Sequence, residues 1–412
     1  MRRRDTKPRL RTAGLVVVVA LVGAVLALAG CGGSKQEAAS EALRTEFRAP
    51  QPFELDEVFR DSHFACGARD GECVLAYLIG LTDDYGPRAA LPVLERLQKE
   101  GRVDLSVNDH ALAHAVGRET AKTFGSNFKS FDLCPTTFNY GCPHGFFEYV
   151  LGRTDTPKEA ASSVCETASG EGNRLLTAGF SCYHGVGHGV MMAEAYDLKA
   201  ALATCNTFAT HEAAEGCWQG VFMENVNAGM AGTARKGVFS RTRPLAPCDG
   251  VERRYRHQCF INHAGWLMSV AGNRVERATG YCLAARGADR TACMQSIGLM
   301  VTNPVWQATL APNARSKSQS TVAWELCERF PPVGREDCVL AGIDNLANFD
   351  GFDVAREKAF CAEVGTAIRA ACYRQIGVNL RARTEDQAIL RSRCQRLGAN
   401  TGLCLRGAGL GA

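Results

Sequence analysis

Short helical stretches, separated by turn-forming breaks, recur along most of the chain. Residues 320–327 form one such stretch, two prolines and a glycine within 331–334 interrupt it, and residues 335–346 form the next. No segment alternates apolar and polar residues as a half-buried β-strand does. The pattern therefore predicts an all-α chain of helical hairpins, with longer connections at residues 229–247 and 303–320.

The first thirty residues follow a different pattern. Residues 1–11 are basic, and residues 13–30 form an almost unbroken apolar run. This run barely reaches the length of a membrane-spanning helix, whereas small residues gather at its far end, as they do at a signal-peptide cleavage site. We therefore expect residues 1–30 to be a signal peptide, with an uncleaved anchor helix as the alternative. Either one places the body of the protein outside the cytoplasm.

Two cleavage sites compete at the end of this leader. Ala27-Leu28-Ala29 fits an ordinary signal-peptidase site, while Leu28-Ala29-Gly30-Cys31 resembles the lipobox of bacterial lipoproteins. The resemblance covers only the leader, and it implies that Cys31 is diacylated and becomes the mature N-terminus. Two acyl chains would anchor the protein stably to the cell membrane. Residues 31–52 would then be the lipid anchor and a flexible tether, and residues 53–412 a single helical-repeat domain.

The net charge changes when the leader is set aside. The full chain carries 47 basic and 43 acidic residues, a formal charge of +4, and six of those basic residues and one acid lie in the leader. The remainder has 41 basic and 42 acidic residues, so its charge is −1. Nothing in this balance indicates a nucleic-acid partner. The expected partners are the membrane, through the lipidated N-terminus, and a protein that the sequence does not identify.

Cysteines mark the hairpins at regular positions. The chain has 19, and 18 remain if Cys31 carries lipid, an even number that can pair completely. Because exported chains meet an oxidising environment, we expect nearest neighbours to form disulfides, each joining the end of one helix to the start of the next. The nine expected disulfides are Cys66–Cys73, Cys134–Cys142, Cys165–Cys182, Cys205–Cys217, Cys248–Cys259, Cys282–Cys293, Cys327–Cys338, Cys361–Cys372 and Cys394–Cys404.

The spacing of these pairs reveals an internal repeat. From Cys142 onward, the second cysteines of successive pairs lie 32 to 45 residues apart. The step from Cys73 to Cys142 is 69 residues, about two periods. A period of this size is typical of helical-repeat proteins, which the body resembles generally without fitting a named family. We expect about ten disulfide-stapled hairpins that form an α-solenoid or a closed α/α ring.

A glycine follows the second cysteine of several pairs by a few residues, as Gly145, Gly220 and Gly377 illustrate. Inside a helix each glycine costs about 1 kcal/mol relative to alanine. Its recurrence predicts close packing between helices, or close approach of the backbone to a bound group.

Three consecutive hairpins carry metal-ligand residue types at matching positions. Counted from Cys142 or Cys182, these residues occupy positions +2 and +6, and in the hairpin without cysteines Asn108 takes the place of the cysteine. Residues four apart share one helix face, and stacked hairpins would set these faces side by side. The three pairs are His110 and His114, His144 and Glu148, and His184 and His188.

The next hairpin continues this face in weaker form through His211 and Glu215, so the metal face is expected within residues 108–224. Imidazoles with a carboxylate suit a divalent transition metal, namely zinc, iron, manganese, copper or nickel. Calcium would require mostly oxygen ligands. The set suffices for one ion or for two adjacent ions.

Two other interpretations compete with a metal face. The histidines can form a buried polar network with one another and with Tyr140 or Tyr183. If reduced, Cys142 or Cys182 can bind metal beside the histidines, although export favours disulfides.

Three classes of function fit these observations, and they leave open whether the protein is an enzyme. A metal-dependent enzyme would use Glu148, Tyr183 or Glu215 as acid or base. A metal capture or delivery protein would hold the ion without catalysis. A protein-interaction scaffold would keep the histidines for structural reasons.

Overall fold

The computed structural model describes residues 43–104, 107–135, 137–154, 156–170, 178–314, 316–350 and 353–411. Within them the chain forms 21 α-helices and no β-strand, which confirms the all-α fold. The predicted leader and Cys31 lie outside the described residues. The helices before residue 232 are α1 (Leu55–Asp61), α2 (Gly71–Tyr85), α3 (Pro87–Lys99), α4 (Asp109–Phe124), α5 (Phe128–Phe131), α6 (Thr137–Leu151), α7 (Pro157–Gly170), α8 (Ala178–Ala193), α9 (Leu198–Cys205) and α10 (His211–Ala231). Those after it are α11 (Arg253–Ile261), α12 (Ala264–Ala271), α13 (Val275–Cys282), α14 (Gly287–Val301), α15 (Pro304–Leu310), α16 (Gln319–Glu328), α17 (Arg335–Asp350), α18 (Ala355–Glu363), α19 (Thr366–Arg381), α20 (Gln387–Gln395) and α21 (Thr401–Gly407), with short 3-10 turns at η2 (Pro332–Gly334) and η3 (Gly398–Asn400).

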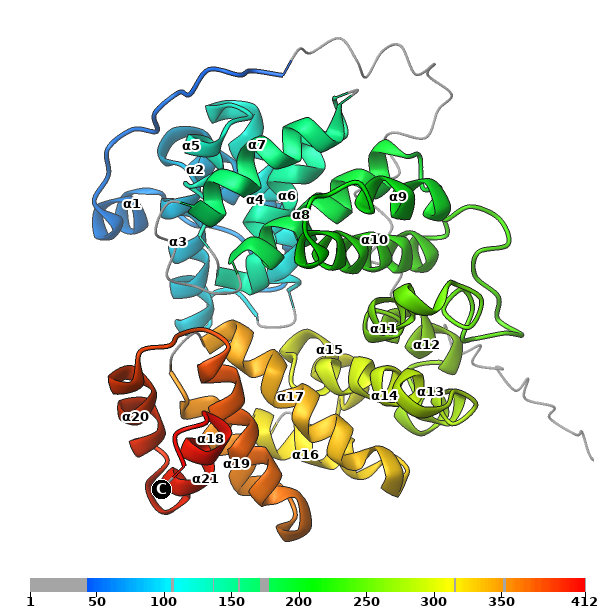
Figure 1. Cartoon of the computed structure of the whole chain (residues 1–412). Coiled ribbons are helices and arrows are strands. Elements are labelled where there is room, and N and C mark those ends of the chain that lie inside the picture. The colour runs from blue at the N-terminus through cyan, green and yellow to red at the C-terminus, as the bar shows by residue number, and fades with distance from the viewer. Residues whose placement is uncertain are drawn as a thin grey trace, which may run out of the picture. The chain divides into compact units, whose positions relative to one another are not determined.

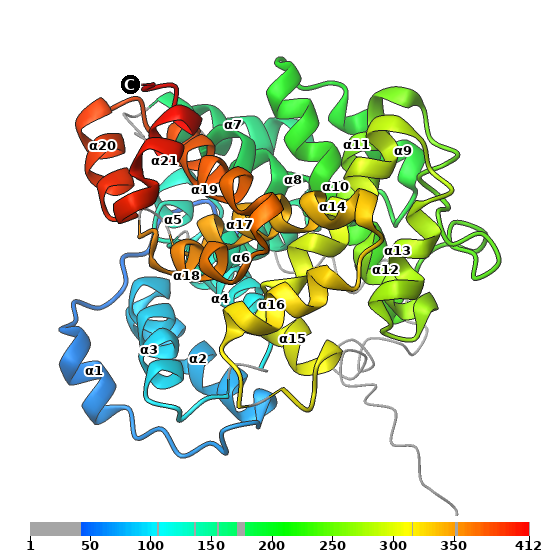
Figure 2. The ribbon, with the colours of Figure 1, turned by 90° about the horizontal axis from the view of Figure 1, so that it is seen from below.

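The second helices of successive hairpins pack against one another in chain order. The helices α4, α6, α8 and α10 form the first such series (Figure 1). The helices α11 and α12 connect α10 to α14, and α17, α19 and α21 follow. Each helix therefore buries its apolar face mainly against its sequence neighbours, as in a helical-repeat protein. The helix α17 also packs against α6, so a late hairpin contacts one of the early ones (Figure 2).

Side-chain caps begin several of these helices. Asn108, Asp197, Thr210 and Ser318 each accept a hydrogen bond from a backbone N–H three residues later, which satisfies one of the unpaired donors of a helix start. A cap also explains where the expected loop at 303–320 was wrong. The Asn303 side chain accepts from the N–H of Val305, and a proline occupies the first turn, so α15 forms inside that loop.

All nine expected disulfides are present. The Cα–Cα separations lie between 5.4 and 5.7 Å, within the range that the bond requires. In six pairs both cysteines belong to helices, so the bond joins two consecutive helices as predicted. The first partners Cys66, Cys134 and Cys248 lie instead in the segments before α2, α6 and α11.

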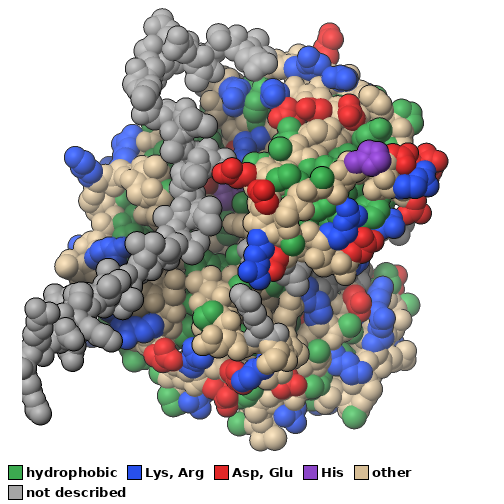
Figure 3. Space-filling model, turned by 180° about the vertical axis from the view of Figure 1, so that it is seen from behind, with side chains coloured by type: hydrophobic (Ala, Val, Ile, Leu, Met, Phe, Trp, Pro, Cys, Tyr) green, Lys and Arg blue, Asp and Glu red, His purple; other side chains and the backbone are tan. Residues whose placement is uncertain are grey.

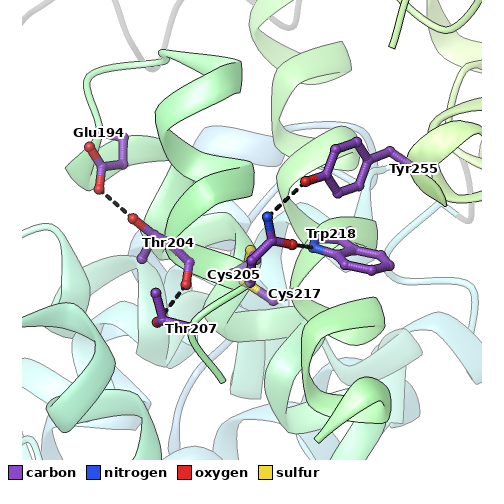
Figure 4. Close-up of a disulfide and its surroundings, with 8 residues drawn as sticks. Glu194, Thr204, Cys205, Thr207, Cys217, Trp218 and Tyr255 are labelled. Atoms are coloured by element: carbon purple, nitrogen blue, oxygen red, sulfur yellow. Dashed lines mark hydrogen bonds between the residues drawn. A yellow bond between two sulfur atoms is a disulfide. The ribbon is translucent and has the colours of Figure 1, made fainter. Parts of the chain in front are cut away.

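The disulfide between Cys205 and Cys217 joins α9 to α10 within one hairpin, and side chains beside it contact the next hairpin (Figure 4). Beside it, the Trp218 indole N–H donates to the Asn206 side-chain oxygen over 3.1 Å. The Asn206 amide donates in turn to the Tyr255 hydroxyl of α11 over 2.7 Å. The Trp218 and Tyr255 rings also meet edge to face. The covalent link within the hairpin is thus extended by polar and aromatic contacts to the following hairpin.

Part of the expected tether lies along the folded domain. In residues 43–52, the Arg44 carbonyl accepts from the N–H of Ser126, and the N–H of Arg48 donates to the Phe124 carbonyl. These contacts run past Gly125, whose φ is 110° and where a Cβ would meet the Glu46 carbonyl oxygen at 2.5 Å. Only a glycine permits this close approach. Eleven residues, 32–42, lie between Cys31 and the docked segment, and a stretch of this length spans at most about 40 Å.

Charged side chains of both signs are interspersed over the face that Figure 3 shows. In the described part of the chain, several charged residues form largely exposed ion pairs, such as Arg69 with Asp104 at 3.0 Å, and such pairs add little to stability. Among the described helices, none combines the length and the apolarity that a membrane crossing requires.

A buried histidine at the start of α12 is expected to make stability depend on pH. His263 is fully buried, its Nε2–H donates to the Pro244 carbonyl over 2.7 Å, and its ring stacks on Phe239. Burial lowers the pKa of His263 to about 4, whereas an unfolded histidine has a pKa near 6.5. The unfolded chain therefore binds more protons below pH 6.5, and stability is lost as the pH falls from there towards 4.

We predict that wild type loses about 3 kcal/mol more unfolding free energy between pH 8 and pH 4 than a His263→Gln variant does. Glutamine can donate to Pro244 but does not titrate. Urea unfolding of both proteins at several pH values measures the difference. Equal losses in the two proteins would show that His263 does not titrate on unfolding.

Candidate metal centre

Four neighbouring helices bring the candidate site together. These helices are α4, α6, α8 and α10, and each packs against the next one in this series. The side chains that meet are His110 and His114 from α4, His144 and Glu148 from α6, His184 and His188 from α8, and Gln219 and Glu224 from α10.

Glycines let these helices approach backbone to backbone. A Cβ at Gly145 would lie 1.8 Å from the His114 carbonyl oxygen, and one at Gly220 would lie 1.9 Å from that of His184. No Cβ tolerates such distances, so only glycine fits. Close helix packing therefore explains these glycines, as one of the two sequence interpretations predicted. The same contacts bring the histidines of neighbouring helices within reach of one another.

The five histidine rings form one cluster with His144 at its centre. The centroid of the His144 ring lies 4.6 Å from that of His184 and 5.2 Å from those of His114 and His188. The His110 ring lies 5.7 Å away. Apart from the half-buried His110, all these side chains are buried. The structure thus unites the three histidine-bearing pairs that the sequence places in register.

The first pair of rings faces nitrogen to nitrogen. The Nε2 atoms of His110 and His114 are 3.0 Å apart. The Nδ1 of His110 lies 2.8 Å from the Phe138 carbonyl oxygen, and the Nδ1 of His114 lies 2.6 Å from a carboxylate oxygen of Glu148. Both partners only accept hydrogen bonds. Each Nδ1 therefore carries the proton, and each Nε2 turns its lone pair towards the other ring.

The second pair repeats this arrangement on α8. The Nε2 atoms of His184 and His188 are 3.3 Å apart. The Nδ1 of His184 lies 2.7 Å from the side-chain oxygen of Gln219, and the Nδ1 of His188 lies 3.1 Å from the Glu224 carboxylate. Here too the acceptors hold the Nδ1 protons, so two Nε2 lone pairs face each other.

A cation between the two nitrogens resolves this repulsion. With a metal–nitrogen distance of about 2.0–2.1 Å, two imidazole nitrogens lie about 3.3 Å apart at a tetrahedral angle and about 2.9 Å apart at a right angle. The observed spacings of 3.0 and 3.3 Å match these values. Hydrogen bonds from the distal nitrogen to a carboxylate or carbonyl are also the usual support of metal-binding histidines.

The central ring has a donor or acceptor without a partner. The Nδ1 of His144 is buried and makes no hydrogen bond within the described residues. His144 belongs to two ligand groups whose atoms lie within 4.8 Å of one another, one with His110 and His114 and one with His184 and His188. A metal ion bound through the Nδ1 of His144 would give this buried nitrogen the partner that it lacks.

Burial favours the neutral form of three of the rings, which leaves their lone pairs available. It lowers the pKa of His110 and His184 to about 3, and the neighbouring imidazoles act in the same direction. The pKa of His144 is lowered well below its usual value for the same reasons. Neutral imidazole is the form that binds metal.

Two carboxylates lie behind the rings. Burial alone would raise the pKa of Glu148, but the His114 ring and the Arg118 guanidinium outweigh it, so the pKa lies below its usual range. Glu224 accepts from His188 and, over 3.1 Å, from the Tyr196 hydroxyl. Burial and this carboxylate raise the pKa of Tyr196. The cluster therefore contains negative charge that can balance a bound cation.

The sequence pattern overlooks Glu224 and Tyr196. Glu224 lies seven residues after Cys217, one position outside the +2 and +6 register, and Tyr196 lies in the turn after α8. Glu224, His188 and Glu148 also form a group of ligand-type atoms within 4.8 Å. Because the two carboxylates already accept the imidazole Nδ1 protons, we interpret them as the support of the ligands.

Several other candidate residues lie away from this cluster. His211 and Glu215 occur on the first turns of α10, where their side chains are 77% and 38% exposed and lie 3.5 Å from each other. The Tyr183 ring packs against Phe208. Neither His211 nor Glu215 belongs to the ligand groups among the described residues.

The fold and this cluster define a disulfide-rich helical-repeat protein with a buried histidine centre. Neither a protein-family model, nor a curated protein, nor a solved structure matches the chain.

The close approach at Gly145 yields a test of the helix packing. We predict that Gly145→Ala lowers the unfolding free energy by at least about 3 kcal/mol, since the methyl group forces α4 and α6 apart. Gly80→Ala is the control, because a Cβ there meets nothing within 4 Å, and it should stabilise α2 by about 0.5–1 kcal/mol. Urea unfolding measures both. A mild effect at Gly145 would mean that the helices do not approach so closely.

Proposed function

We propose that this protein is a lipid-anchored, extracytoplasmic metal-binding protein that holds one or two divalent transition-metal ions between α4, α6, α8 and α10. The observation that carries the proposal is the pair of Nε2-to-Nε2 contacts, at 3.0 and 3.3 Å, between rings whose Nδ1 atoms face hydrogen-bond acceptors. A polar network without metal would require an additional proton between the rings of each pair. Burial opposes placing that proton on His110 or His184, because it penalises their imidazolium form.

The surroundings of the cluster favour metal capture or delivery over catalysis. A general acid or base must reach a reacting group with its proton free to move. Glu148 is held by His114 and Arg118, and Glu215 lies outside the cluster beside His211. Nitrogen-rich ligands suit zinc, copper, nickel and iron, and manganese less well. The function supported best is therefore binding of such an ion in a buried, largely preformed site.

Elemental analysis of the full chain, exported through an oxidising route, tests metal binding. We expect one or two equivalents of a single transition metal in wild type. His144→Ala and His188→Ala should each lose most of it, because each removes a ring shared by several contacts of the cluster. His211→Ala is the matched control, since its ring is exposed and outside the cluster.

The bound metal should also raise the unfolding free energy of wild type, by about 2.7 kcal/mol when the free metal concentration is a hundred times its Kd. No stoichiometric metal in folded wild type, even after reloading with each candidate ion, would contradict the proposal. The histidines would then form a polar network in an interaction scaffold.

Membrane attachment rests on different observations. The lipobox-like sequence that ends in Cys31 leaves 18 cysteines, and all of these are paired as nine disulfides in the body. Such a number of disulfides fits an oxidising compartment outside the cytoplasm. The docked segment that begins near Leu43 would keep the domain within about 40 Å of the membrane surface.

We predict that the full chain, expressed in a bacterium that modifies lipoproteins, fractionates with membranes and gains the mass of a diacylglyceryl group on Cys31. Cys31→Ser should appear in the soluble fraction or retain its leader, because a serine hydroxyl does not replace the thiol that carries the lipid. Mass spectrometry of the N-terminal peptide measures both results. An unmodified peptide that begins after Ala29 would instead indicate ordinary signal-peptide cleavage.

A further inference from the structure

Glu148 connects the histidine cluster to the solvent-exposed surface. Its side chain is 7% exposed, that of His188 is fully buried, and that of Arg118 is 41% exposed. One carboxylate oxygen of Glu148 faces inward, 2.6 Å from the Nδ1 of His114 and 3.9 Å from the Nδ1 of His188. The other oxygen accepts a hydrogen bond from the Arg118 guanidinium. The order from solvent to cluster is thus arginine, carboxylate, imidazoles.

Arg118 reaches this position because it follows His114 by one helical turn on α4. Within the described residues, Glu148 is its one ion-pair partner, so the guanidinium serves no second carboxylate. It places a positive charge at the outer side of a buried anionic group. An approaching divalent cation would be attracted by Glu148 and repelled by Arg118.

A buried carboxylate of this kind is a natural first contact for a metal ion, since carboxylate oxygens exchange for water readily at divalent cations. Arg118 occupies the oxygen that such an ion would meet first. On a route past Glu148 the ion must wait until the guanidinium moves aside, and a long, half-exposed side chain can do so without disturbing the helices.

We propose that Arg118 is a latch that controls the passage of divalent metal ions past Glu148 into and out of the histidine cluster. This inference rests on the proposed metal-binding function. It adds the route of the ion and the residue that sets its rate of exchange.

Metal-uptake kinetics test the latch. Metal-free full chain is mixed with Zn²⁺ in a stopped-flow instrument, and release is followed by transfer to a chromophoric zinc indicator. In Arg118→Met, uptake should accelerate by about tenfold, because one repulsive charge and one blocking group are removed. Release should be at least as fast as in wild type, because an open route serves both directions.

Two further variants separate the latch from a general effect of charge. Arg118→Lys keeps the charge and should exchange zinc at nearly the wild-type rate. Arg153→Met removes an arginine that stacks on Tyr149 of α6, with 4.0 Å between the guanidinium carbon and the ring centroid, and it should leave both rates unchanged. If Arg118→Met does not fold, Arg118→Gln takes its place. Its neutral amide removes the repulsive charge and binds the Glu148 carboxylate more weakly than the guanidinium does, so uptake faster than in Arg118→Lys is expected.

The outcomes distinguish the latch from the metal site itself. If wild type and Arg153→Met bind no stoichiometric zinc or other candidate ion, the proposed function fails. If they bind it and Arg118→Met takes it up at the wild-type rate, the site stands and the latch is overturned, because the ion then passes elsewhere, for example beside Glu224. Faster uptake combined with slower release would indicate only a change of affinity, and would also overturn the latch.

Discussion

The backbone contact between neighbouring second helices is the constraint on which the rest of this structure depends. At Gly145 and Gly220 the helices approach so closely that a single methyl group would overlap a carbonyl oxygen of the adjacent helix. Helices with ordinary side chains at their contact pack 8–10 Å apart. The shorter separation lets imidazoles on three consecutive helices touch, and it also lets α10 supply acceptors to the rings of α8.

Hydrogen bonds at the outer nitrogen of the rings fix which nitrogen of each histidine faces into the cluster. A histidine can present either nitrogen, and the acceptor at Nδ1 selects which one faces inward. A carbonyl, an amide and two carboxylates perform this selection for four rings. Burial then favours the neutral form of His110, His144 and His184, and the two carboxylates supply the charge that a divalent ion requires. The spacing of the nitrogens, the tautomers of the histidines and the charge of the carboxylates thus all favour a divalent metal ion.

The disulfides join the helices of this cluster to the segments that precede them. Each bridge closes a short loop and contributes about 2–3 kcal/mol in the chain-entropy model. In α6, α8 and α10 the bridged cysteine precedes the first residue of the cluster by only two positions. The bond therefore ties each of these helices to the segment before it at a point close to the cluster. In α4 the Asn108 cap occupies the equivalent position and fixes the helix start by a hydrogen bond.

Much of the fold of this protein could be predicted from its sequence, because the patterns that indicate it involve residues close together in the chain. Cysteine spacing, repeat length and the +2 and +6 register depend on residues a few positions apart, so they predicted the all-α repeat, the disulfides and the histidine face. Where each Nδ1 points depends on partners 28 to 36 residues away, and no local pattern contains that information. The tertiary structure alone placed Glu224 and Tyr196 behind the rings and Arg118 outside them, and left His211 and Glu215 in solvent. The register of one helix against the next sets these contacts, and packing across the hairpins determines that register.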